Sequence, residues 1–529
     1  MTGPAADLRA DYVIVGAGSA GCVLAARLSA DPSVQVLLLE AGDRDGAAQM
    51  SIPAAFPKLF GTKYDWAFDT EPEPELSGRS IYWPRGRTLG GSSSINAQIW
   101  TRGHPADYDG WAATGLDGWA HASVEPYFRR AEEVLGVTDL RDPNPTTADF
   151  LAACHKAGLS RMADEAGAEP DGYAPIRVNQ LNGRRRSVAD AYLRPALERP
   201  NLTVLTGART RRVLLSGEQA TGVEVDLDGT VQVITADREV ILAAGAVGSP
   251  HLLMLSGIGD RAVLAEAGIP TLVELPEVGT GLRDHLFTPL AVAAREPVSP
   301  GVGDQSQDVK EFFRTRTGKL TSNLAEAVAW TRSDDRLPVP DIELLWMPVP
   351  FVDHGRGWDG HGLTLCVVLL QPVSSGRITP RSADPADAPR IEAGYLADPD
   401  GADLATLVTA TRRAQAVLGQ EPLAPWIGEA LLPGVLDSSE AAVTQLIRDH
   451  AETLYHPVGT CRMGADENSV LDPDLRVRGV AGLRVVDASA LPNVPRAHTH
   501  APTVMLAERA SDLIRADRPI RADRLIRAD

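Results

Sequence analysis

Cysteines and long apolar runs are both scarce in this chain of 529 residues. The cysteines lie far apart, without a CxxC pair or the spacing of a metal finger, at Cys22, Cys154, Cys366 and Cys461. We therefore expect reduced, mostly buried thiols and no metal site. The first apolar run, residues 12–15, is too short for a signal peptide, and no run reaches membrane-spanning length. These absences predict a cytoplasmic protein without a membrane partner.

An excess of positive charge is also missing. The formal net charge is −19, which argues against nucleic acid or an anionic membrane surface as a partner, because both would repel the chain. With 44% hydrophobic and 23% charged residues, the composition is that of an ordinary soluble protein. Domains usually hold about 100 to 200 residues, so two or three lobes are expected.

The N-terminal region carries a nucleotide-binding pattern. Residues 11–30 predict a strand, a glycine turn and a helix, and residues 34–39 predict the next strand. In the motif GAGSAG, Gly16 permits a tight turn, Gly18 lets the backbone approach a pyrophosphate, and Gly21 lets helix and strand pack closely. The helix N-terminus then faces the phosphates. Glu40 ends the second strand, where a carboxylate can accept hydrogen bonds from both ribose hydroxyls. The motif predicts a dinucleotide site rather than a turn that only packs, but it does not separate FAD from NAD.

Strand and helix patterns continue along the chain. Residues 53–83, rich in proline and aromatics, predict an ordered surface excursion, and residues 107–163 are helical in pattern. Residues 201–225 predict two strands around a turn at Ser216–Gly217. Further strands are expected at 240–243, 342–347, 363–370 and 483–486, and helices at 403–418 and 502–514. Nucleotide-type segments thus return after long insertions, which indicates a discontinuous cofactor domain. The tail repeats IRAD and predicts a solvated extension.

Four later segments resemble the glucose–methanol–choline (GMC) oxidoreductase family. Residues 86–96 (GRTLGGSSSIN) look like its first signature, and residues 245–250 (GAVGSP) through 256–259 (SGIG) look like its second. Residues 455–464 (YHPVGTCRMG) resemble its catalytic histidine segment. Residues 485–489 (VVDAS) and 498–502 (HTHAP) resemble its C-terminal flavin segment. The matches run from residue 11 to about residue 515, in the family's order and spacing.

The resemblance implies an α/β fold with a discontinuous Rossmann-like FAD-binding domain and an α+β substrate domain with an antiparallel sheet. We assign residues 8–45, 80–105, 200–290 and 452–516 to the FAD domain. Residues 46–79, 106–199 and 291–451 form the substrate domain and excursions, and residues 517–529 form the tail. The predicted FAD-contacting residues are Gly16, Gly18, Ser19, Ala20, Gly21, Glu40, Ala41, Arg87, Gly90, Gly91, Ser92, Asn96, Ala97, Val213, Ala244, Gly245, Asp487, Ala488, His500, Pro502 and Thr503.

Several of these positions also make physical sense by themselves. Gly90 and Gly91, followed by three serines, give a backbone that can lie against a flat ring and donate N–H groups to it. Asp487 suits the ribityl or pyrophosphate region, with a helix cap as its alternative role. Pro502 suits the first residue of a helix, whose amides could stabilise negative charge on a reduced flavin. Val213 falls at the family's adenine-side contact, but it fits plain core as well.

Oxidation of an alcohol needs a proton acceptor for the hydroxyl, and histidine suits this role because its free pKa is about 6.5. His456 and His498 occupy the family's two catalytic positions and are predicted to be catalytic. His500 is ambiguous, since it could replace His498 or face the flavin pyrimidine. His104 and His285 are interpreted as structural.

The sequence therefore predicts FAD-dependent oxidation of a primary alcohol by hydride transfer to flavin N5. An aromatic, furanic or allylic alcohol is favoured over choline, since histidine stands where choline dehydrogenases usually carry asparagine. Trp100, Trp330, Trp346 and Phe351 lie in segments expected to form the roof over the flavin, with ordinary core packing as their alternative role. Oxygen is the favoured acceptor, and FAD is expected to be non-covalent because Ile95 occupies the family's linkage position. The alternatives are a choline-dehydrogenase-like enzyme with another acceptor, a hydroxynitrile lyase, an NAD-dependent dehydrogenase and a non-catalytic FAD-binding relative.

Overall fold

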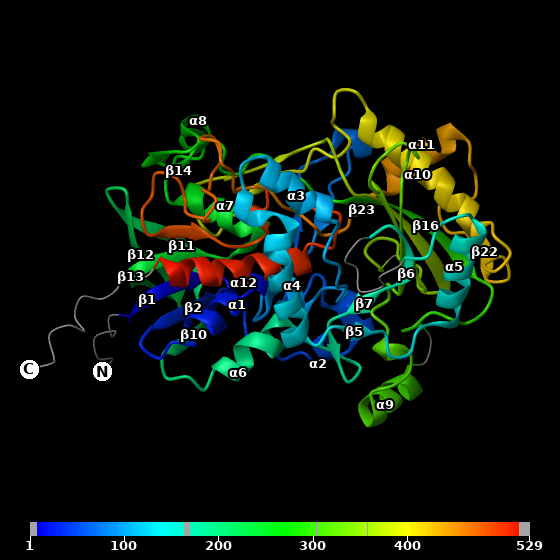
Figure 1. The fold of residues 1–529 in the computed structure, drawn as a ribbon, viewed down its shortest axis with the longest axis horizontal. Helices are drawn as coiled ribbons and strands as arrows, with labels where there is room; N and C mark the ends of the chain where they lie inside the picture. Colours follow the sequence, from blue (N-terminus) through cyan, green and yellow to red (C-terminus); the bar gives the residue numbers. More distant parts are fainter. Residues whose placement is uncertain (1–7, 163–169, 303–304, 357, 518–529) are drawn as a thin grey trace, which may run out of the picture.

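In the computed structural model, residues 8–162, 170–302, 305–356 and 358–517 are described (Figure 1). The predicted C-terminal extension lies outside these ranges, apart from Asp517 at the end of the last helix.

The first seven-stranded sheet gathers strands from both ends of the chain. Its order is β10-β2-β1-β13-β12-β11, and β24 pairs with the end of β13 on the edge opposite β1. The pairs β10–β2, β2–β1, β1–β13 and β13–β24 are parallel, whereas β13–β12 and β12–β11 are antiparallel. The strands are β1 (Leu8–Val15), β2 (Val36–Glu40), β10 (Leu202–Thr206), β11 (Arg209–Ser216), β12 (Gln219–Leu227), β13 (Thr230–Leu242) and β24 (Leu483–Val485).

Helices pack around this sheet at the edge where the parallel strands end. Helix α1 (Ser19–Leu28) follows β1 and packs against α12 (His500–Ala516), which in turn contacts α4 (His121–Leu135). In Figure 1, α12 runs alongside α1, so the two ends of the sequence lie together. Helix α7 (Gly245–Leu255) follows β13. The carboxyl ends of β1, β2 and β13 therefore open toward helix N-termini, which is where nucleotides bind in doubly wound sheets.

The second seven-stranded sheet is antiparallel, in the order β22-β16-β19-β18-β17-β6, with β23 paired to β16. Helices α5 (Pro145–Lys156), α10 (Ala402–Leu418) and α11 (Glu440–His450) lie at the same end of the molecule (Figure 1). The strands are β6 (Gly172–Pro175), β16 (Leu286–Ala294), β17 (Ala327–Thr331), β18 (Ile342–Met347), β19 (Gly362–Leu369), β22 (Ile427–Ala430) and β23 (Glu452–Thr453).

Strand β18 separates two hydrophobic cores because its successive side chains point to opposite faces of the sheet. Ile342, Leu344 and Trp346 pack with residues of α5 and α10. Leu345 and Met347 belong to the core on the other face. Both faces of this strand are buried, so it has no polar side and reads in the sequence as an apolar run with one acidic residue, Glu343.

The remaining elements are short, except for α3 and α9. Helices are α2 (Ala48–Ser51), α3 (Pro105–Ala113), α6 (Arg194–Ala196), α8 (Arg261–Glu266) and α9 (Ser306–Thr315). Strands are β3 (Phe68–Asp69), β4 (Tyr82–Trp83), β5 (Thr138–Asp139), β7 (Arg177–Val178), β8 (Gln180–Leu181), β9 (Arg184–Arg185), β14 (Ile258–Gly259), β15 (Val273–Glu274), β20 (Arg377–Thr379) and β21 (Arg390–Glu392).

Most predicted elements are present, and three differ. Residues 201–225 hold parts of three strands, because a break at residues 207–208 divides the first predicted strand into β10 and β11. The strand expected at 240–243 is the end of the longer β13. Helix α12 begins at His500, so Pro502 is its third residue rather than its first.

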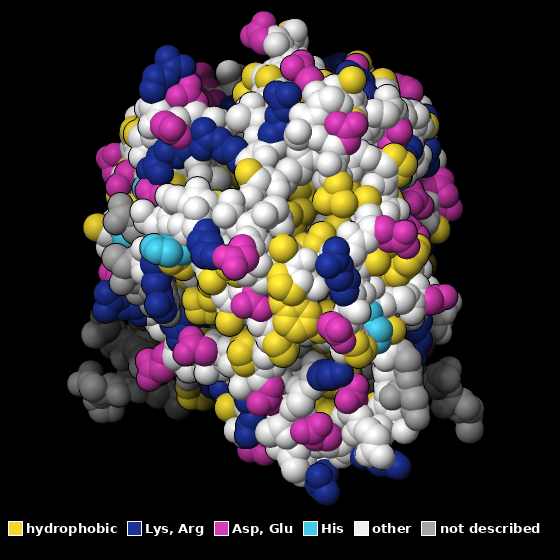
Figure 2. Space-filling view, turned by 90° about the vertical axis from the view of Figure 1, so that its right-hand side faces the viewer, with side chains coloured by type: hydrophobic (Ala, Val, Ile, Leu, Met, Phe, Trp, Pro, Cys, Tyr) yellow, Lys and Arg dark blue, Asp and Glu magenta, His cyan; other side chains and the backbone are white. Residues whose placement is uncertain are grey.

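Among the described residues, no helix is both long and apolar enough to cross a bilayer. Figure 2 views the face at the second-sheet end, where acidic and basic side chains are interspersed around a central group of apolar ones.

Candidate active site

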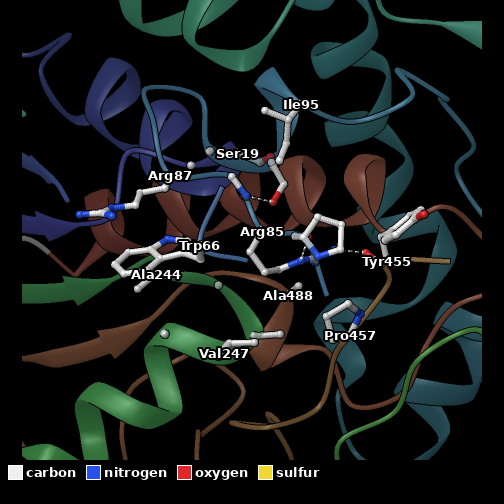
Figure 3. A pocket seen from close by; sticks show the side chains of 18 of the residues that line it. Ser19, Trp66, Arg85, Arg87, Ile95, Ala244, Val247, Tyr455, Pro457 and Ala488 are labelled. Atoms are coloured by element: carbon white, nitrogen blue, oxygen red, sulfur yellow. Dashed lines mark hydrogen bonds between the residues drawn. The ribbon is translucent and has the colours of Figure 1, made fainter. Parts of the chain in front are cut away.

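A cavity of about 500 Å³ begins at the carboxyl ends of β1 and β2 and reaches the inner face of the second sheet. Figure 3 shows Arg87 and Trp66 toward one end and Tyr455 and Pro457 toward the other. Most of the predicted FAD-contacting residues line this cavity, so segments more than 400 residues apart in sequence form one site.

The glycine motif forms the close backbone contacts that the sequence predicts. A Cβ atom on Gly21 would lie 1.8 Å from the carbonyl oxygen of Gly16, so the start of α1 packs against the turn only without a side chain. Gly91 has a φ of +51°, and a Cβ atom there would lie 2.7 Å from the Cα atom of Gly18. The two predicted signatures thus meet backbone to backbone beside the cavity.

Glu40 lies at the end of β2 with its carboxylate buried. Its two oxygens accept the N–H groups of Ala17 and Gly42, each across 2.9 Å. Burial raises the pKa of Glu40 to about 7, although these two N–H groups oppose the increase. Each carboxylate oxygen keeps a second lone pair, so this geometry still allows it to accept from ribose hydroxyls.

Buried polar atoms along the cavity fit a polar ligand. Arg87 Nε, Gln98 Oε1 and His500 Nε2 are buried without a hydrogen-bond partner in the described part of the chain. All three residues line the cavity. Buried polar atoms are normally paired, so unpaired atoms of opposite hydrogen-bonding character in one cavity indicate a ligand with both donors and acceptors. A flavin dinucleotide has this chemistry.

Asp487 is more fully occupied by protein partners than the sequence indicates. Its Oδ2 accepts from Gly245 N and Ser249 Oγ, and its Oδ1 accepts from Ser489 N and Oγ. The residue therefore caps a short turn and ties β24 to the start of α7. It also lines the cavity, so its predicted contact with a cofactor remains a prediction.

Four predicted cofactor residues do not line the cavity: Gly21, Gly90, Val213 and Pro502. The two glycines shape the turns beside it. Val213 is 2% exposed in the main hydrophobic core, and its N–H donates to Ser256 Oγ. The interpretation of Val213 as an adenine contact is therefore corrected to core packing, because Ala208, Arg209 and Thr210 line the cavity instead.

His456 and His498 meet at the inner end of the cavity. Their rings lie edge to face at 85°, with centroids 4.7 Å apart. His498 Nε2 donates to Glu343 Oε1 across 2.9 Å, and its main-chain N–H donates to Thr101 Oγ1. Glu343 comes from the cavity face of β18. The structure thus brings together the two histidines that the sequence predicts and adds a carboxylate that it missed.

His285 lies against the ring of His456. Its Nδ1 lies 2.9 Å from His456 Nδ1, and its Nε2 donates to the carbonyl oxygen of Leu370 across 3.1 Å. The main-chain N–H of His456 donates to Asp284 Oδ1. His285, interpreted from the sequence as structural, therefore lies within the histidine cluster and holds the ring of His456. Nothing in its spacing from residue 456 signals this contact, which depends on pairing between β16 and β23. His104, by contrast, caps helix α3 as a structural residue would.

The environment of the cluster disfavours a positive charge on His456 and on His285. Burial holds the pKa of His456 well below its ordinary value, with further lowering from the charges of His498, His285 and Arg85. Burial also lowers the pKa of His285 to about 3. Neutral imidazole is the form that can accept a proton, so His456 has the protonation state that a general base requires.

His500 lies apart from this cluster. Its Nδ1 is 3.4 Å from Ser19 Oγ at the start of α1, and its ring meets Trp100 edge to face at 5.7 Å. Burial lowers the pKa of His500 to about 4. Its position beside the nucleotide motif favours a role toward the cofactor over a role in the catalytic pair.

The inner end of the cavity is apolar and aromatic. Phe60 lies 5.8 Å from Phe56 and from Tyr455 between ring centroids, and Phe351 lies 6.4 Å from Phe56. The lining here comprises Phe56, Phe60, Ile99, Ala325, Leu345, Met347, Phe351, Cys366, Leu454 and Tyr455. Phe56 and Phe60 were missed because the excursion at 53–83 has no periodicity to place them.

Only part of the predicted roof faces the cavity. Phe351 lines it, whereas Trp346 stacks on Phe150 on the opposite face of the second sheet, 5.2 Å between centroids. Trp346 does not lie in the roof, because its side chain points to the opposite face of β18 from that of Leu345. Trp330 belongs to the cavity-side core without lining the cavity, and Trp100 donates to Glu132 beside His500. Arg85, partly buried in the cavity wall and bonded to the carbonyl oxygen of Tyr455, was not predicted.

Models of the GMC oxidoreductase family match residues 10–287 and 372–507. The chain belongs to the GMC oxidoreductase family. It is 46% identical over 529 residues to an uncharacterized GMC-type oxidoreductase of Mycobacterium tuberculosis (96% of this chain, 100% of the relative). It is 42% identical to an alcohol dehydrogenase [acceptor] of Pseudomonas putida, with 95% of each chain covered. An oxygen-dependent choline dehydrogenase of Photobacterium profundum is 40% identical, with 96% of this chain and 93% of the relative covered.

Solved GMC structures share the whole fold. Pyridoxine 4-oxidase from Mesorbium loti superposes with a TM-score of 0.87 at 33% identity, covering 96% of this chain and 100% of that one. Formate oxidase from Aspergillus oryzae RIB40, a structure that concerns FAD modification, gives a TM-score of 0.88 at 27% identity, covering 97% and 99%. The predicted family, fold class and enzyme class are thereby confirmed.

Proposed function

We propose that this GMC oxidoreductase uses FAD to oxidise a primary alcohol to the aldehyde, with His456 as the base. The observation that carries the proposal is the histidine pair, whose rings meet at 4.7 Å at the inner end of a cavity that begins at a dinucleotide motif. The rings of His456 and His498 thus lie together at the end of the cavity away from the glycine turns, next to apolar side chains.

The residues that line the glycine-turn end of the cavity would hold FAD. The start of α1 would face the pyrophosphate, and Glu40 would accept from ribose hydroxyls. The turn at Gly91 and Ser92, together with the first turn of α12, would lie at the flavin. Bound FAD would supply a hydride acceptor and then pass the electrons to oxygen or another acceptor.

The protein's own part is to hold the alcohol and take its proton. Neutral His456 accepts the hydroxyl proton as the carbon–hydrogen bond breaks. His498, whose Nε2 donates to Glu343, packs edge to face against His456 and would hold that ring toward the alcohol. The apolar side chains around them exclude water from the reacting carbon.

An aromatic, furanic or allylic alcohol fits the inner end of the cavity better than choline. Carboxylates occur in the cavity lining only at Glu40, Asp387 and Asp487, among the described residues. Glu40 and Asp487 bond to the glycine turns, and Asp387 lies near His251 of α7, so all three belong to the cofactor end. A quaternary ammonium needs an aromatic cage with negative charge. This end offers the rings, but the nearby carboxylate of Glu343 is bonded to His498 and does not line the cavity.

The choline alternative retains support from the 40% identity to an oxygen-dependent choline dehydrogenase.

Oxygen is the electron acceptor that we propose. Arg85 is a partly buried cation that acts on His456, and a protonated His456 after the reaction would add a second positive charge. Together the two charges would stabilise superoxide. The relative from Pseudomonas putida is named as an acceptor-dependent dehydrogenase, so a dye acceptor belongs in the same assay.

Anaerobic titration tests the proposal. Purified protein with its yellow flavin is mixed with cinnamyl alcohol in the absence of oxygen, and absorbance is followed. Bleaching at a rate that His456→Ala reduces by about 10²–10⁴-fold, with FAD still bound, is the expected result. A flavin that stays oxidised while the protein cleaves a cyanohydrin would instead identify a lyase. On re-aeration, stoichiometric peroxide supports oxygen as acceptor, and turnover with dye alone refutes it.

A further inference from the structure

Two consecutive residues, Asp284 and His285, bind the main chain and the ring of His456. Asp284 Oδ1 accepts the main-chain N–H of His456 across 2.7 Å. Its other oxygen accepts the hydroxyl groups of Tyr395 and Thr453. His285 contacts the His456 ring at Nδ1, with the two rings nearly perpendicular at 80°. Both histidine side chains are buried, so no solvent atom replaces these contacts.

The hydrogen-bond chain through His285 has one consistent arrangement of protons. A carbonyl oxygen only accepts, so Leu370 requires the proton of His285 on Nε2. The Nδ1 of a neutral His285 is then a lone pair. Because this lone pair faces Nδ1 of His456 at 2.9 Å, the proton between them belongs to His456. The Nε2 of His456 consequently carries a lone pair.

We propose that His285 is a positioning residue that holds His456 in the Nδ1–H tautomer and so keeps Nε2 ready to accept the alcohol proton. This role rests on the proposed function of His456 as the base. The fixed proton on one nitrogen decides which nitrogen of the base faces the substrate, in the way that a carboxylate orients the base of a hydrolytic triad.

The reverse arrangement, with His285 donating from Nδ1, would require His285 to be doubly protonated. Burial lowers the pKa of His285 to about 3, so this form is absent at neutral pH. Among the described residues, the charged or titratable groups that act on the two rings are His498, Arg85 and Arg496, with Asp284 at the main chain. His498 and Arg85 both disfavour an added proton on His456, which keeps the chain of hydrogen bonds neutral.

Two substitutions separate positioning from packing. His285→Asn keeps an amide oxygen near the position of Nδ1, and His285→Leu removes the acceptor while filling the space. We expect His285→Leu to slow anaerobic flavin reduction at saturating alcohol by about 10–100-fold, and His285→Asn to stay within about fivefold of the wild type. FAD content and the apparent Kd of the alcohol should change little in both. Equal rates in the two variants, or slowing that only follows FAD loss, would overturn the proposal.

A second measurement reads the tautomer directly and does not depend on activity. Histidine labelled with ¹⁵N in the wild-type holoenzyme reports by NMR which ring nitrogen carries the proton, and His456→Asn assigns its signal by loss. The expected pattern is a protonated Nδ1 on His456 and a protonated Nε2 on His285. A protonated Nε2 on His456 would refute the tautomer even in an active enzyme. If the wild type shows the expected tautomer but the His456→Ala variant still reduces flavin at the wild-type rate, His456 is not the base. The positioning of the His456 ring by His285 would still hold.

Discussion

His498 Nε2 lies 2.9 Å from Glu343 Oε1, and their side chains are only 7% and 1% exposed. The contact joins the segment before α12 to the second residue of β18, a strand of the second sheet. A buried carboxylate with this partner is costly to leave unpaired, because neither group can be hydrated. The pair therefore fixes the orientation of the second histidine relative to His456.

Substitutions at Glu343 should reveal this orienting role. Glu343→Gln keeps an amide oxygen to accept from His498, whereas Glu343→Leu leaves the imidazole without a partner. We expect flavin reduction to slow by about tenfold in the first variant and by at least about 100-fold in the second. The melting temperature should fall most for Glu343→Leu. Rapid-scan reduction by a single alcohol measures both rates, and a Leu variant as fast as the wild type would contradict the role.

His498 and His500 should differ in what they lose on substitution. His498→Ala removes the ring beside His456, so we expect slower flavin reduction with FAD retained. His500→Ala removes contacts with Ser19 and Trp100 at the cofactor, so we expect weaker FAD binding and a smaller effect on reduction of the bound fraction. Reduction rates and FAD dissociation constants are measured on both variants. Greater damage to reduction from His500→Ala would reverse the assignment of the second catalytic histidine.

The sequence predicts the parts of this site that local motifs encode. The glycine turn after β1, the acid at the end of β2 and the histidines of the two C-terminal segments all arise from short patterns with a backbone reason. These patterns also give β18 and α10 to within one residue. Local chemistry was sufficient there because each element's ends are set by its own residues.

The missed residues depend on long-range pairing. His285 reaches His456 because β16 pairs with β23, and Glu343 reaches His498 because β18 sits inside the second sheet. Side chains alternate between the two faces of β18, so Leu345 faces the cavity and Trp346 does not. Because both faces are buried, the apolar run does not reveal in the sequence which residues face the cavity. Val213 was misplaced for the same reason, since core and cavity positions in β11 look alike in sequence.

The dependence of flavin reduction on pH should follow the depressed pKa of His456. The base works in its neutral form, and burial together with neighbouring cations holds its pKa well below 6.5. The reduction rate at saturating alcohol should therefore stay constant as pH falls from 8 to about 6 and decline only in more acidic solution. Stopped-flow reduction over this range measures the profile. A midpoint above 6.5 would show that the base is not held neutral in this way.

FAD should be released without covalent attachment. Ile95, at the position where some family members carry a linking histidine, is 2% exposed and has no nucleophilic atom. The nearest cavity-lining histidines, His251, His456, His498 and His500, come from other segments. After acid precipitation the yellow colour should appear in the supernatant, with the absorption of free FAD. Colour that remains with the pellet would contradict this expectation and direct attention to those histidines.

The charge preference of the substrate site can be tested with two alcohols of the same shape. In choline, a quaternary nitrogen is bonded to the carbon next to the hydroxyl-bearing carbon. In 3,3-dimethylbutan-1-ol, a quaternary carbon takes the place of that nitrogen. The inner end of the cavity is lined by Phe56, Phe60, Met347 and Phe351, and none of its described lining residues is a carboxylate. No negative charge in the lining therefore offsets the free-energy cost of removing the ammonium group from water. We expect kcat/KM to be at least about tenfold higher for the carbon analogue, and higher again for cinnamyl alcohol, whose conjugation stabilises the carbon as hydride leaves. Because the ammonium group also withdraws electrons from the reacting carbon, the apparent Kd of each alcohol is measured alongside kcat/KM, and the ratio of the two Kd values isolates the charge. Choline outperforming its uncharged analogue on the same preparation would refute the aromatic-alcohol proposal and support a choline dehydrogenase.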